Sequence, residues 1–311
     1  MNTPSPAAQA ALALKRAGIE YVGEPRPLGH GCDNAVVAVT ASDGRDLVVR
    51  VAVSGRARFD TARTAGLRAA EHDIPVPDVL WHDQRACVET RLPGTPLADT
   101  AHQASAARSA AAEHAGHLLR RWHTIAADGF GALDEHGRGR HATFASWLLA
   151  LPEPAATGLG QHTFQRAAGV LAEHSGFQPP SRLLHGDLVG RHLLYEGGAI
   201  TGVIDLDSAR AGDPLSEIAG WTLRGPAGLR EPLIGAYFPA VPTAEELARI
   251  ALYRVRIVLS MLAFHTARGD EAYAAALTGV LTCDVDDLAD RRPRLLPALS
   301  LPPDPLHPDD L

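Results

Sequence analysis

The sequence predicts an α+β protein in which a small β-rich lobe, residues 1–90, precedes a larger helical lobe, residues 91–311. Two observations lead to this prediction. Runs of β-branched residues separated by turn residues fill the first lobe, as is typical of short strands. After Gly94, Ala-rich segments with a helical spacing of apolar residues predominate. A chain of 311 residues is long enough to bury a large core and to form two lobes.

The first segment, "MNTPSPAAQAALALKRAG", is expected to form a helix. It lacks a basic region before its short apolar stretch, so it does not resemble a secretory signal peptide. No apolar run approaches the ~18 residues that cross a membrane, and the three cysteines lie far apart without a Cys-x-x-Cys motif. These observations predict a cytoplasmic protein without a membrane partner, a disulfide framework or a zinc ribbon.

The next segments predict the strands of the first lobe. Two β-branched runs, Asn34–Ala41 and Asp46–Ala52, are separated by an Asp-Gly pair, which is a strong hairpin signal. "ARFDTARTAGLRAAEH" predicts a helix, and "IPVPDVLW" and "RACVETRLPG" predict further short strands. Gly29 and Gly31 are expected in a loop just before the first run. Such a loop can lay backbone N–H groups over phosphates, although a lone Gly-x-Gly is more often a tight turn.

Helical patterns predominate in the second lobe, first in "ASAARSAAAEHAGHLLRRWHTI" and then near Ala244–Arg268 and Asp270–Leu281. Trp122 and His123 follow the first of these patterns and are expected to pack in the core. The acidic run "CDVDDLAD" is expected at a solvated helix start, with recognition of a cationic ligand as the less favoured interpretation.

Charge and motif content exclude several function classes. The net charge of −7 and the lack of a basic stripe argue against a nucleic-acid partner. Lys15 is the only lysine, so a Walker phosphate loop is excluded, and a cation that holds a phosphate in the core must be an arginine. Arg50 is a candidate, because it alternates with Val49 and Val51 and must face either solvent or an anion. No His-Glu-x-x-His or Gly-x-Ser-x-Gly motif supports hydrolysis.

The most informative segment is "HGDLVGRHLLYEGGAITGVIDLDSARAGDP", which spans residues 185–214. It predicts a strand, a Glu-Gly-Gly turn and a second strand, with Asp187 before the first strand and Asp205 after the second. The hairpin would bring both carboxylates together, and they repel unless a cation lies between them. Mg²⁺ prefers such oxygen ligands. Either residue alone is more simply a turn cap or a strand end, but the pair favours a metal site.

Taken in order, several segments resemble the aminoglycoside/macrolide phosphotransferase family, which comprises antibiotic kinases with a bilobal protein-kinase-like fold. The segments are "PLGHGCDNAVVAV", "LVVRV", "IPVPDVL", "VETRLPGTPL", "LLHGDLVGRHLLY" and "GVIDLDSARAGDP". The resemblance covers about residues 20 to 220. Its most specific part is His-Gly-Asp-Leu followed by the pair Ile-Asp and Gly-Asp-Pro.

The resemblance implies that the N-terminal lobe binds a nucleoside triphosphate, ATP or GTP. Gly29 and Gly31 would cover the phosphates, and Arg50 would replace the lysine that usually binds them. The connector would hold the nucleobase through backbone groups near Thr90 and Leu92.

The resemblance also implies roles for the second lobe, which would hold the catalytic loop and the acceptor site. Asp187 would orient the acceptor hydroxyl and take its proton, and Asp205 would chelate the Mg²⁺ that bridges the nucleotide phosphates. His192 stands where the family usually has an asparagine metal ligand, and macrolide kinases of the family also carry a histidine there. The family's helix glutamate, which pairs with the lysine, aligns with Arg63. Asp60, one turn earlier, is a candidate replacement.

These observations predict an enzyme that transfers the γ-phosphate of ATP or GTP to a hydroxyl of a small molecule. An antibiotic of macrolide, aminoglycoside or nucleoside type is the expected acceptor, and its phosphorylation would give resistance. A metabolite kinase with a homoserine- or choline-like acceptor is one alternative. A non-catalytic nucleotide-binding pseudokinase is the alternative from another class. The helices after Trp221, which should bind the acceptor, carry no motif that selects among these acceptors.

Overall fold

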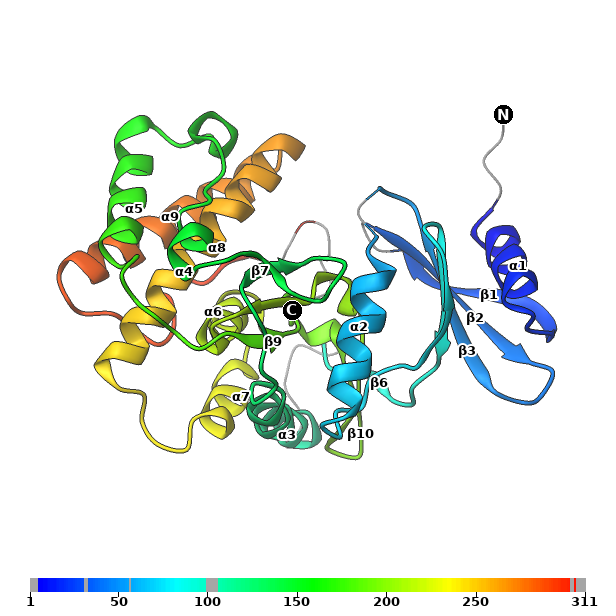
Figure 1. Ribbon diagram of the computed structural model, residues 1–311. Coiled ribbons are helices and arrows are strands. Elements are labelled where there is room, and N and C mark those ends of the chain that lie inside the picture. The colour runs from blue at the N-terminus through cyan, green and yellow to red at the C-terminus, as the bar shows by residue number, and fades with distance from the viewer. Residues whose placement is uncertain (1–4, 31–32, 56, 99–105, 303–304, 306–311) are drawn as a thin grey trace.

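The computed structural model describes residues 5–30, 33–55, 57–98, 106–302 and 305. Its N-terminal part is a β-sheet flanked by helices, and its C-terminal part is mainly helical (Figure 1). The α+β fold class expected from the sequence is therefore confirmed. The division into lobes at residue 90 stays a prediction, although Thr90 ends β5, the last strand of this sheet in chain order.

The N-terminal sheet has five antiparallel strands in the spatial order β1-β2-β3-β5-β4. They are β1 (Tyr21–His30), β2 (Asn34–Ala41), β3 (Asp46–Ala52), β4 (Val79–His82) and β5 (Ala86–Thr90). The expected hairpin is confirmed, because β2 and β3 pair over their full lengths across the Asp-Gly turn. The expected helices are α1 (Pro6–Ala17) and α2 (Phe59–Ala70).

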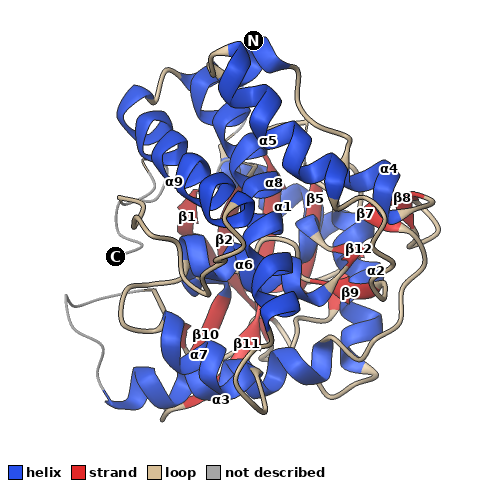
Figure 2. Ribbon diagram, turned by 90° about the vertical axis from the view of Figure 1, so that its left-hand side faces the viewer, coloured by secondary structure: helices blue, strands red, loops and turns tan. Residues whose placement is uncertain are grey.

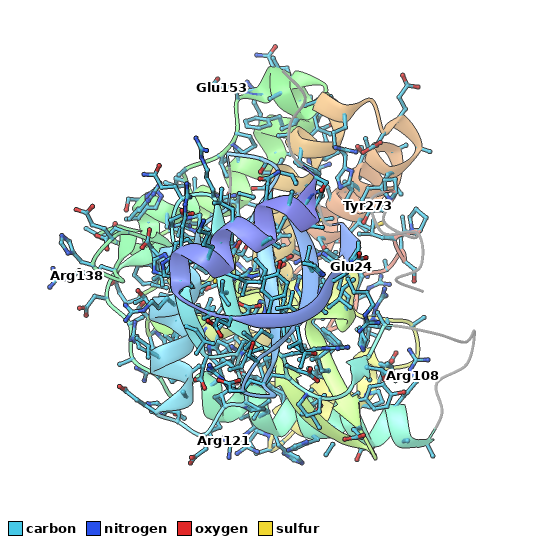
Figure 3. All side chains as sticks on the ribbon, turned by 90° about the vertical axis from the view of Figure 1, so that its right-hand side faces the viewer. Glu24, Arg108, Arg121, Arg138, Glu153 and Tyr273 are labelled. Carbon is cyan, nitrogen blue, oxygen red and sulfur yellow. The ribbon has the colours of Figure 1, made fainter. Side chains whose placement is uncertain are left out.

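The two faces of this sheet differ because side chains alternate along each strand. Val37, Val49 and Val88 are fully buried on one face, where they pack in one cluster with apolar residues of α1. Figure 3 shows α1 lying across this face, in front of the strands. Val48 and Arg50 line a cavity on the other face. Arg50 is only 5% exposed, so it faces the interior and not the solvent.

The expected glycine loop before β2 is partly wrong. β1 continues to His30 and includes Gly29, which pairs with Val36 of β2. β1 is an edge strand, and its pairing shifts register between Val22 and Arg26 and again between Pro27 and Gly29. These irregularities accommodate prolines, which cannot donate to a ladder, and they hide the strand from a sequence pattern. Gly31 lies outside the described residues.

The described C-terminal residues form helices around small sheets. The α-helices are α3 (Ala106–Trp122), α4 (Phe144–Leu148), α5 (Gln161–Glu173), α6 (Pro214–Arg224), α7 (Arg230–Tyr237), α8 (Ala244–Arg268) and α9 (Glu271–Ala289). The 3₁₀ turns are η1 (Pro154–Thr157), η2 (Gly190–His192) and η3 (Leu206–Ser208). The strands are β6 (Thr95–Pro96), β7 (Phe130–Leu133), β8 (Gly139–His141), β9 (Arg182–Leu184), β10 (Leu193–Glu196), β11 (Ala199–Val203) and β12 (Arg210–Gly212).

The second expected hairpin is also confirmed, as β10 and β11 pair with each other, and β6 pairs with the far side of β10. Its turn residues Gly197 and Gly198 have φ angles of 58° and 85°, the left-handed conformation that a tight hairpin turn requires. The other sheet, in the order β8-β7-β12-β9, was not expected, because strands of three or four residues show too little alternation to be recognised. β12 pairs with β9, which directly precedes His185.

Long helices enclose these sheets. Figure 2 shows α3 and α7 side by side at one end of the molecule, and α6 packs against α8. Trp122 and Trp221 are almost fully buried in the common core, as expected for Trp122. Within the described ranges, the structure contains no helix that combines the length and the apolar character needed to cross a bilayer.

The expected end of α9 is wrong. The helix continues to Ala289, so "CDVDDLAD" forms its C-terminal part and not a solvated helix start. Arginines neutralise this acidic segment. Asp284 is 1% exposed and accepts hydrogen bonds from Arg254 Nε and Nη2, the latter at 2.6 Å to Oδ1. Asp286 pairs with Arg166 and Asp287 pairs with Arg294. The acids are thus engaged within the protein.

Candidate active site

A cavity of about 980 Å³ lies between the N-terminal sheet and the helical part. Residues of β2, β3 and β5 line one side, and residues of η2, η3, α6 and α8 line the other. Seven of the eight residues singled out in the sequence line it, namely Gly29, Arg50, Thr90, Leu92, Asp187, His192 and Asp205. The eighth, Gly31, is not among the described residues.

The loop after β9 places Asp187 through a buried histidine and a glycine. His185 is fully buried, and its Nε2–H donates to the carbonyl oxygen of Ile204 at 2.9 Å. Its Nδ1 therefore accepts from the backbone N–H of Asp187 at 3.2 Å. Gly186 has a φ of 84°, and a Cβ there would collide with the backbone oxygen of Ser208. The His-Gly-Asp sequence is thus required by local geometry as well as by chemistry.

Glu217 of α6 holds the same loop and was missed in the sequence. Its carboxylate accepts from the backbone N–H groups of His185 at 3.0 Å and Gly186 at 2.6 Å. His123, which is buried as expected, lies 3.1 Å from the same carboxylate and 3.0 Å from the Tyr237 hydroxyl. Burial acts to raise the pKa of Glu217, but these hydrogen bonds outweigh it and lower the pKa, so Glu217 is ionised. Only its place on the helix after Gly-Asp-Pro signals this role.

Asp187 is surrounded by cationic groups. Arg224 Nη1 donates to Asp187 Oδ1 at 2.5 Å, and Arg191 Nη2 lies 3.7 Å from Oδ2. Burial acts to raise the pKa of Asp187, but the charge of Arg224, aided by His192 and Arg191, holds that pKa well below its ordinary value. Asp187 is therefore a carboxylate at any working pH and can accept a hydrogen bond from a hydroxyl group.

His192 has a defined tautomer. Its Nδ1 lies 2.8 Å from the backbone oxygen of Asp187, and a carbonyl oxygen only accepts, so Nδ1 carries a hydrogen. Burial lowers the pKa of His192, which favours the neutral ring. Nε2 then presents a lone pair 3.3 Å from Asp205 Oδ2. Two electron-rich atoms at this separation repel each other unless a cation lies against both of them.

The residues present fit a magnesium ion in this position. Mg²⁺ often binds one or two protein groups and completes its coordination with substrate phosphates and water. Asp205 and His192 provide such a partial set. In the described part of the chain, no cluster of three or more His, Cys, Asp or Glu side chains is arranged to hold a metal by itself. The Asp187 and Asp205 carboxylates lie on either side of the His192 ring, within 3.8 and 3.3 Å of its two nitrogens.

Arg50 joins the N-terminal sheet to the hairpin end. Its Nη1 lies 3.1 Å from Asp205 Oδ1 and 2.7 Å from Asp207 Oδ1, and its Nε lies 3.3 Å from Glu89 Oε2. Burial acts to lower the pKa of Arg50, but Glu89, Asp207 and Asp205 keep it well above its ordinary value. Asp207 in turn accepts from Asn34 Nδ2 at 3.0 Å.

Asp60, the candidate replacement for the family's helix glutamate, does not pair with Arg50. The Asp60 side chain is 90% exposed and lies 3.7 Å from His82. Arg63, on the same helix, is exposed as well. The carboxylate beside Arg50 comes instead from the neighbouring strand, where Glu89 lies on the same face of the sheet. The ion pair is therefore formed between two strands and not between a strand and a helix.

The connector after β5 is engaged with the sheet. The backbone N–H of Thr90 donates to the Asp78 carbonyl oxygen at 3.0 Å, and its hydroxyl accepts from the Asp78 N–H at 2.9 Å. The backbone N–H of Thr90 is therefore already engaged and is not free to bind a nucleobase. Leu92 lines the cavity and contacts the hairpin at Gly202.

Sequence comparison identifies the family of the chain. A model described as the phosphotransferase enzyme family matches residues 24–253, which is more than half of the chain. No curated protein sequence is significantly similar to the chain.

Solved structures with the same fold include kinases of different acceptors. A thermostable mutant of aminoglycoside phosphotransferase APH(4)-Ia, in a ternary complex with AMP-PNP and hygromycin B, has a TM-score of 0.73 at 22% identity, over 91% of this chain and 98% of that chain. Macrolide 2'-phosphotransferase MphH from Brachybacterium faecium has a TM-score of 0.61 at 22% identity, over 87% and 97%. A putative fructosamine-3-kinase from Thermobifida fusca has a TM-score of 0.67 at 22% identity, over 92% and 100%. These likenesses confirm the kinase-like fold.

Removal of the Glu217 carboxylate is expected to destabilise the protein. In Glu217→Ala, two buried backbone N–H groups and His123 lose their partner, so the free energy of unfolding should fall by about 2–4 kcal/mol. Urea denaturation followed by circular dichroism measures this change. Glu231→Ala, at an exposed position of α7, serves as the control and should change stability by less than about 0.5 kcal/mol. Equal stability of the two variants would show that Glu217 does not hold the loop.

Proposed function

Because the chain belongs to the phosphotransferase enzyme family and is a small-molecule kinase, we propose that it transfers the γ-phosphate of ATP to a hydroxyl group of its acceptor. The resemblance of the sequence to the aminoglycoside/macrolide phosphotransferase family is confirmed by this match. One observation supports the proposed reaction most strongly. The same cavity is lined by Arg50, Asp187, His192 and Asp205. The AMP-PNP complex of a structural neighbour supports ATP as the donor, and GTP is the alternative.

The acceptor hydroxyl would donate a hydrogen bond to Asp187, which aims its oxygen at the γ-phosphorus. A bond then forms between this oxygen and phosphorus, and the bond from phosphorus to the β,γ-bridging oxygen breaks. The products are a phosphate ester and ADP, and the hydroxyl proton passes to Asp187 and then to water. Because the pKa of Asp187 is low, it is a weak base. It therefore contributes mainly by positioning, which is the main requirement of a loose phosphoryl-transfer transition state.

The phosphates would be held by Arg50 from β3, with the backbone near Gly29 lying over them. Arginine suits this role because its guanidinium binds phosphate oxygens in a bidentate manner. Asp205 and His192 would hold a Mg²⁺ ion, which neutralises phosphate charge when bound. Binding of phosphates would require Arg50 to exchange part of its present pairing with Asp205 and Asp207.

Two acceptor classes remain in the proposal. An antibiotic acceptor, with resistance as its consequence, is suggested by the hygromycin B complex and by the macrolide kinase among the structural neighbours. A metabolite acceptor is suggested by the putative fructosamine-3-kinase. Turnover of ATP with antibiotics and with hydroxylated metabolites, measured side by side, distinguishes these two classes.

Asp187→Asn is expected to lower turnover at least ~100-fold, the scale on which a misplacement of the reacting group by about 1 Å slows a reaction. ATP affinity should hardly change, because Asp187 would contact the acceptor and not the nucleotide, whereas the melting temperature should fall, because Asp187 pairs with Arg224 and Arg191. Phosphate transfer is measured by ADP release with saturating acceptor. The control is Asp128→Asn, since Asp128 is an exposed carboxylate outside the cavity. Near-native turnover of Asp187→Asn would remove this residue from the mechanism.

Arg50→Ala is expected to weaken ATP binding about tenfold or more, the scale for losing a charge-assisted hydrogen bond, and to leave adenosine binding nearly unchanged. Calorimetric titration with each ligand measures both affinities. Glu89→Gln should weaken ATP binding in the same direction, because Glu89 orients Arg50. Asp60→Asn is the matched control and should bind ATP normally. Equal losses for ATP and adenosine would mean that Arg50 has only a structural role.

Substitution of His192 tests the proposed magnesium site. His192→Leu is expected to raise the magnesium concentration for half-maximal turnover about tenfold or more, because one ligand is lost. His192→Asn supplies the commoner family ligand and should retain a magnesium requirement close to that of the native protein. Turnover is titrated with magnesium at saturating ATP. If His192→Leu has the native magnesium requirement, His192 is not a ligand.

A further inference from the structure

The half of the cavity that faces away from the N-terminal sheet is rich in arginine. Arg191, Arg210, Arg224 and Arg256 line it, from η2, β12, α6 and α8 respectively. Two carboxylates, Asp187 and Glu217, line the same half of the cavity. The Glu217 carboxylate is engaged by the loop that it holds. The other lining carboxylates, Asp33, Glu89, Asp205 and Asp207, lie near Arg50 or at the start of β2.

Arg256 has neutral partners only in the described part of the chain. Its Nη1 donates to the Ser260 hydroxyl and its Nη2 donates to the Ala150 carbonyl oxygen, both at 2.7 Å. Its Cζ lies 5.6 Å from the centre of the Trp147 ring, which fixes the guanidinium plane against the cavity wall. Its buried Nε has no hydrogen-bond partner among the described residues.

Other arginines of α8 are paired differently. Arg249 pairs with Asp213, and Arg254 pairs with Asp284. Carboxylates at the start of α6 and on α9 therefore neutralise these two arginines, whereas Arg256, which lines the cavity, has no carboxylate within ion-pair distance among the described residues. A partly buried cation without a nearby carboxylate is stabilised when a ligand supplies the counter-charge.

Arg210 lines the same cavity beside the loop that carries Asp187. Its Nε donates to the Ser208 carbonyl oxygen at 3.3 Å and would be 2.6 Å from a Cβ built on Gly186, the neighbour of Asp187. Burial, together with the positive charge of Arg210, lowers the pKa of Arg256 to about 10. Burial also lowers the pKa of Arg210, against the attraction of Asp187 and Glu217. Arg210 and Arg256 thus place two like charges on the lining of one cavity.

We infer that the acceptor is a hydroxylated acid, whose carboxylate binds Arg256 and Arg210 while its hydroxyl faces Asp187. This inference rests on the proposed function and specifies its substrate class. A carboxylate would occupy the space between the two guanidiniums and accept hydrogen bonds from both. Trp147, Ile257, Met261 and Phe264 line the same half of the cavity, so the body of the acceptor is apolar or aromatic.

The same charge pattern disfavours cationic acceptors. An ammonium group placed beside Arg256 or Arg210 would meet a like charge in a partly buried site, which is a strong basis for rejecting a ligand. The acids of α9 do not line the cavity, and Asp284, Asp286 and Asp287 pair with arginines of the protein. The acceptor site is therefore built for an anion.

Three probes of equal shape test this inference, namely 4-(hydroxymethyl)benzoate, its amide and 4-(hydroxymethyl)benzylamine. Their dissociation constants are measured by calorimetry on the full chain, with and without saturating ADP and magnesium. The carboxylate is expected to bind about tenfold or more tightly than the amide, and the amine to bind most weakly. The affinity of the carboxylate should fall as the salt concentration rises.

Variants then locate the binding site. Arg256→Gln should weaken binding of the carboxylate about tenfold or more without changing binding of the amide or of ADP. Arg256→Lys should recover part of the loss, and Arg210→Gln should give a second, independent loss. Arg120→Gln removes the same charge from an exposed position of α3 outside the cavity and is the control.

Equal affinities for the three probes, tighter binding of the amine, or no binding of the carboxylate would overturn the inference. An unchanged carboxylate affinity in both Arg256→Gln and Arg210→Gln would do the same. Failure of the proposed function gives a different result, because ADP would then not bind or ATP would not be consumed with any acceptor. The ADP titration separates the two, since a protein that binds ADP but rejects the carboxylate contradicts only the acceptor assignment.

Discussion

The arrangement of the site depends on the ion pairs of Arg50. This residue extends from the N-terminal sheet, yet two of its three carboxylate partners, Asp205 and Asp207, belong to the segment after β11 in the helical part. One nearly buried guanidinium thus connects the surface expected to bind phosphates with the surface expected to bind the metal. The pairing also fixes which face of β3 is functional, because Glu89 must lie on that face of β5 to join it. A shift of one residue in strand register would break this connection.

The loop that carries Asp187 is held from behind by a different set of contacts. Glu217 binds its backbone, His185 bonds to Ile204 at the end of the hairpin, and Gly186 permits the close passage of Ser208. These contacts leave the Asp187 carboxylate itself to face the cavity and its arginines. The loop and the hairpin end are therefore joined by contacts that do not involve the carboxylates of Asp187 and Asp205.

The sequence predicted the features that local chemistry determines. Both hairpins follow from Asp-Gly and Gly-Gly turns, and the pairing of Asp187 with Asp205 follows from the second hairpin. Glu89 and Glu217 were missed, because their roles depend on partners that become neighbours only in the fold, such as the Gly186 N–H, 31 residues from Glu217. The end of α9 was misjudged for the same reason, since the arginine that neutralises Asp284 lies 30 residues away. The strands β7, β9 and β12 are too short to show a period.

The presence of Arg50 on β3, in place of a lysine, has a chemical consequence beyond phosphate binding. An acylating reagent reacts with the neutral form of an amine, and a lysine beside the phosphates can supply that form, whereas a guanidinium stays protonated and does not. The only lysine of this chain, Lys15, is exposed on α1, and α1 covers the opposite face of the sheet from the cavity. Amine-directed profiling would thus modify the outside of the protein and leave an enzyme that still works, so surveys based on such labels would overlook it.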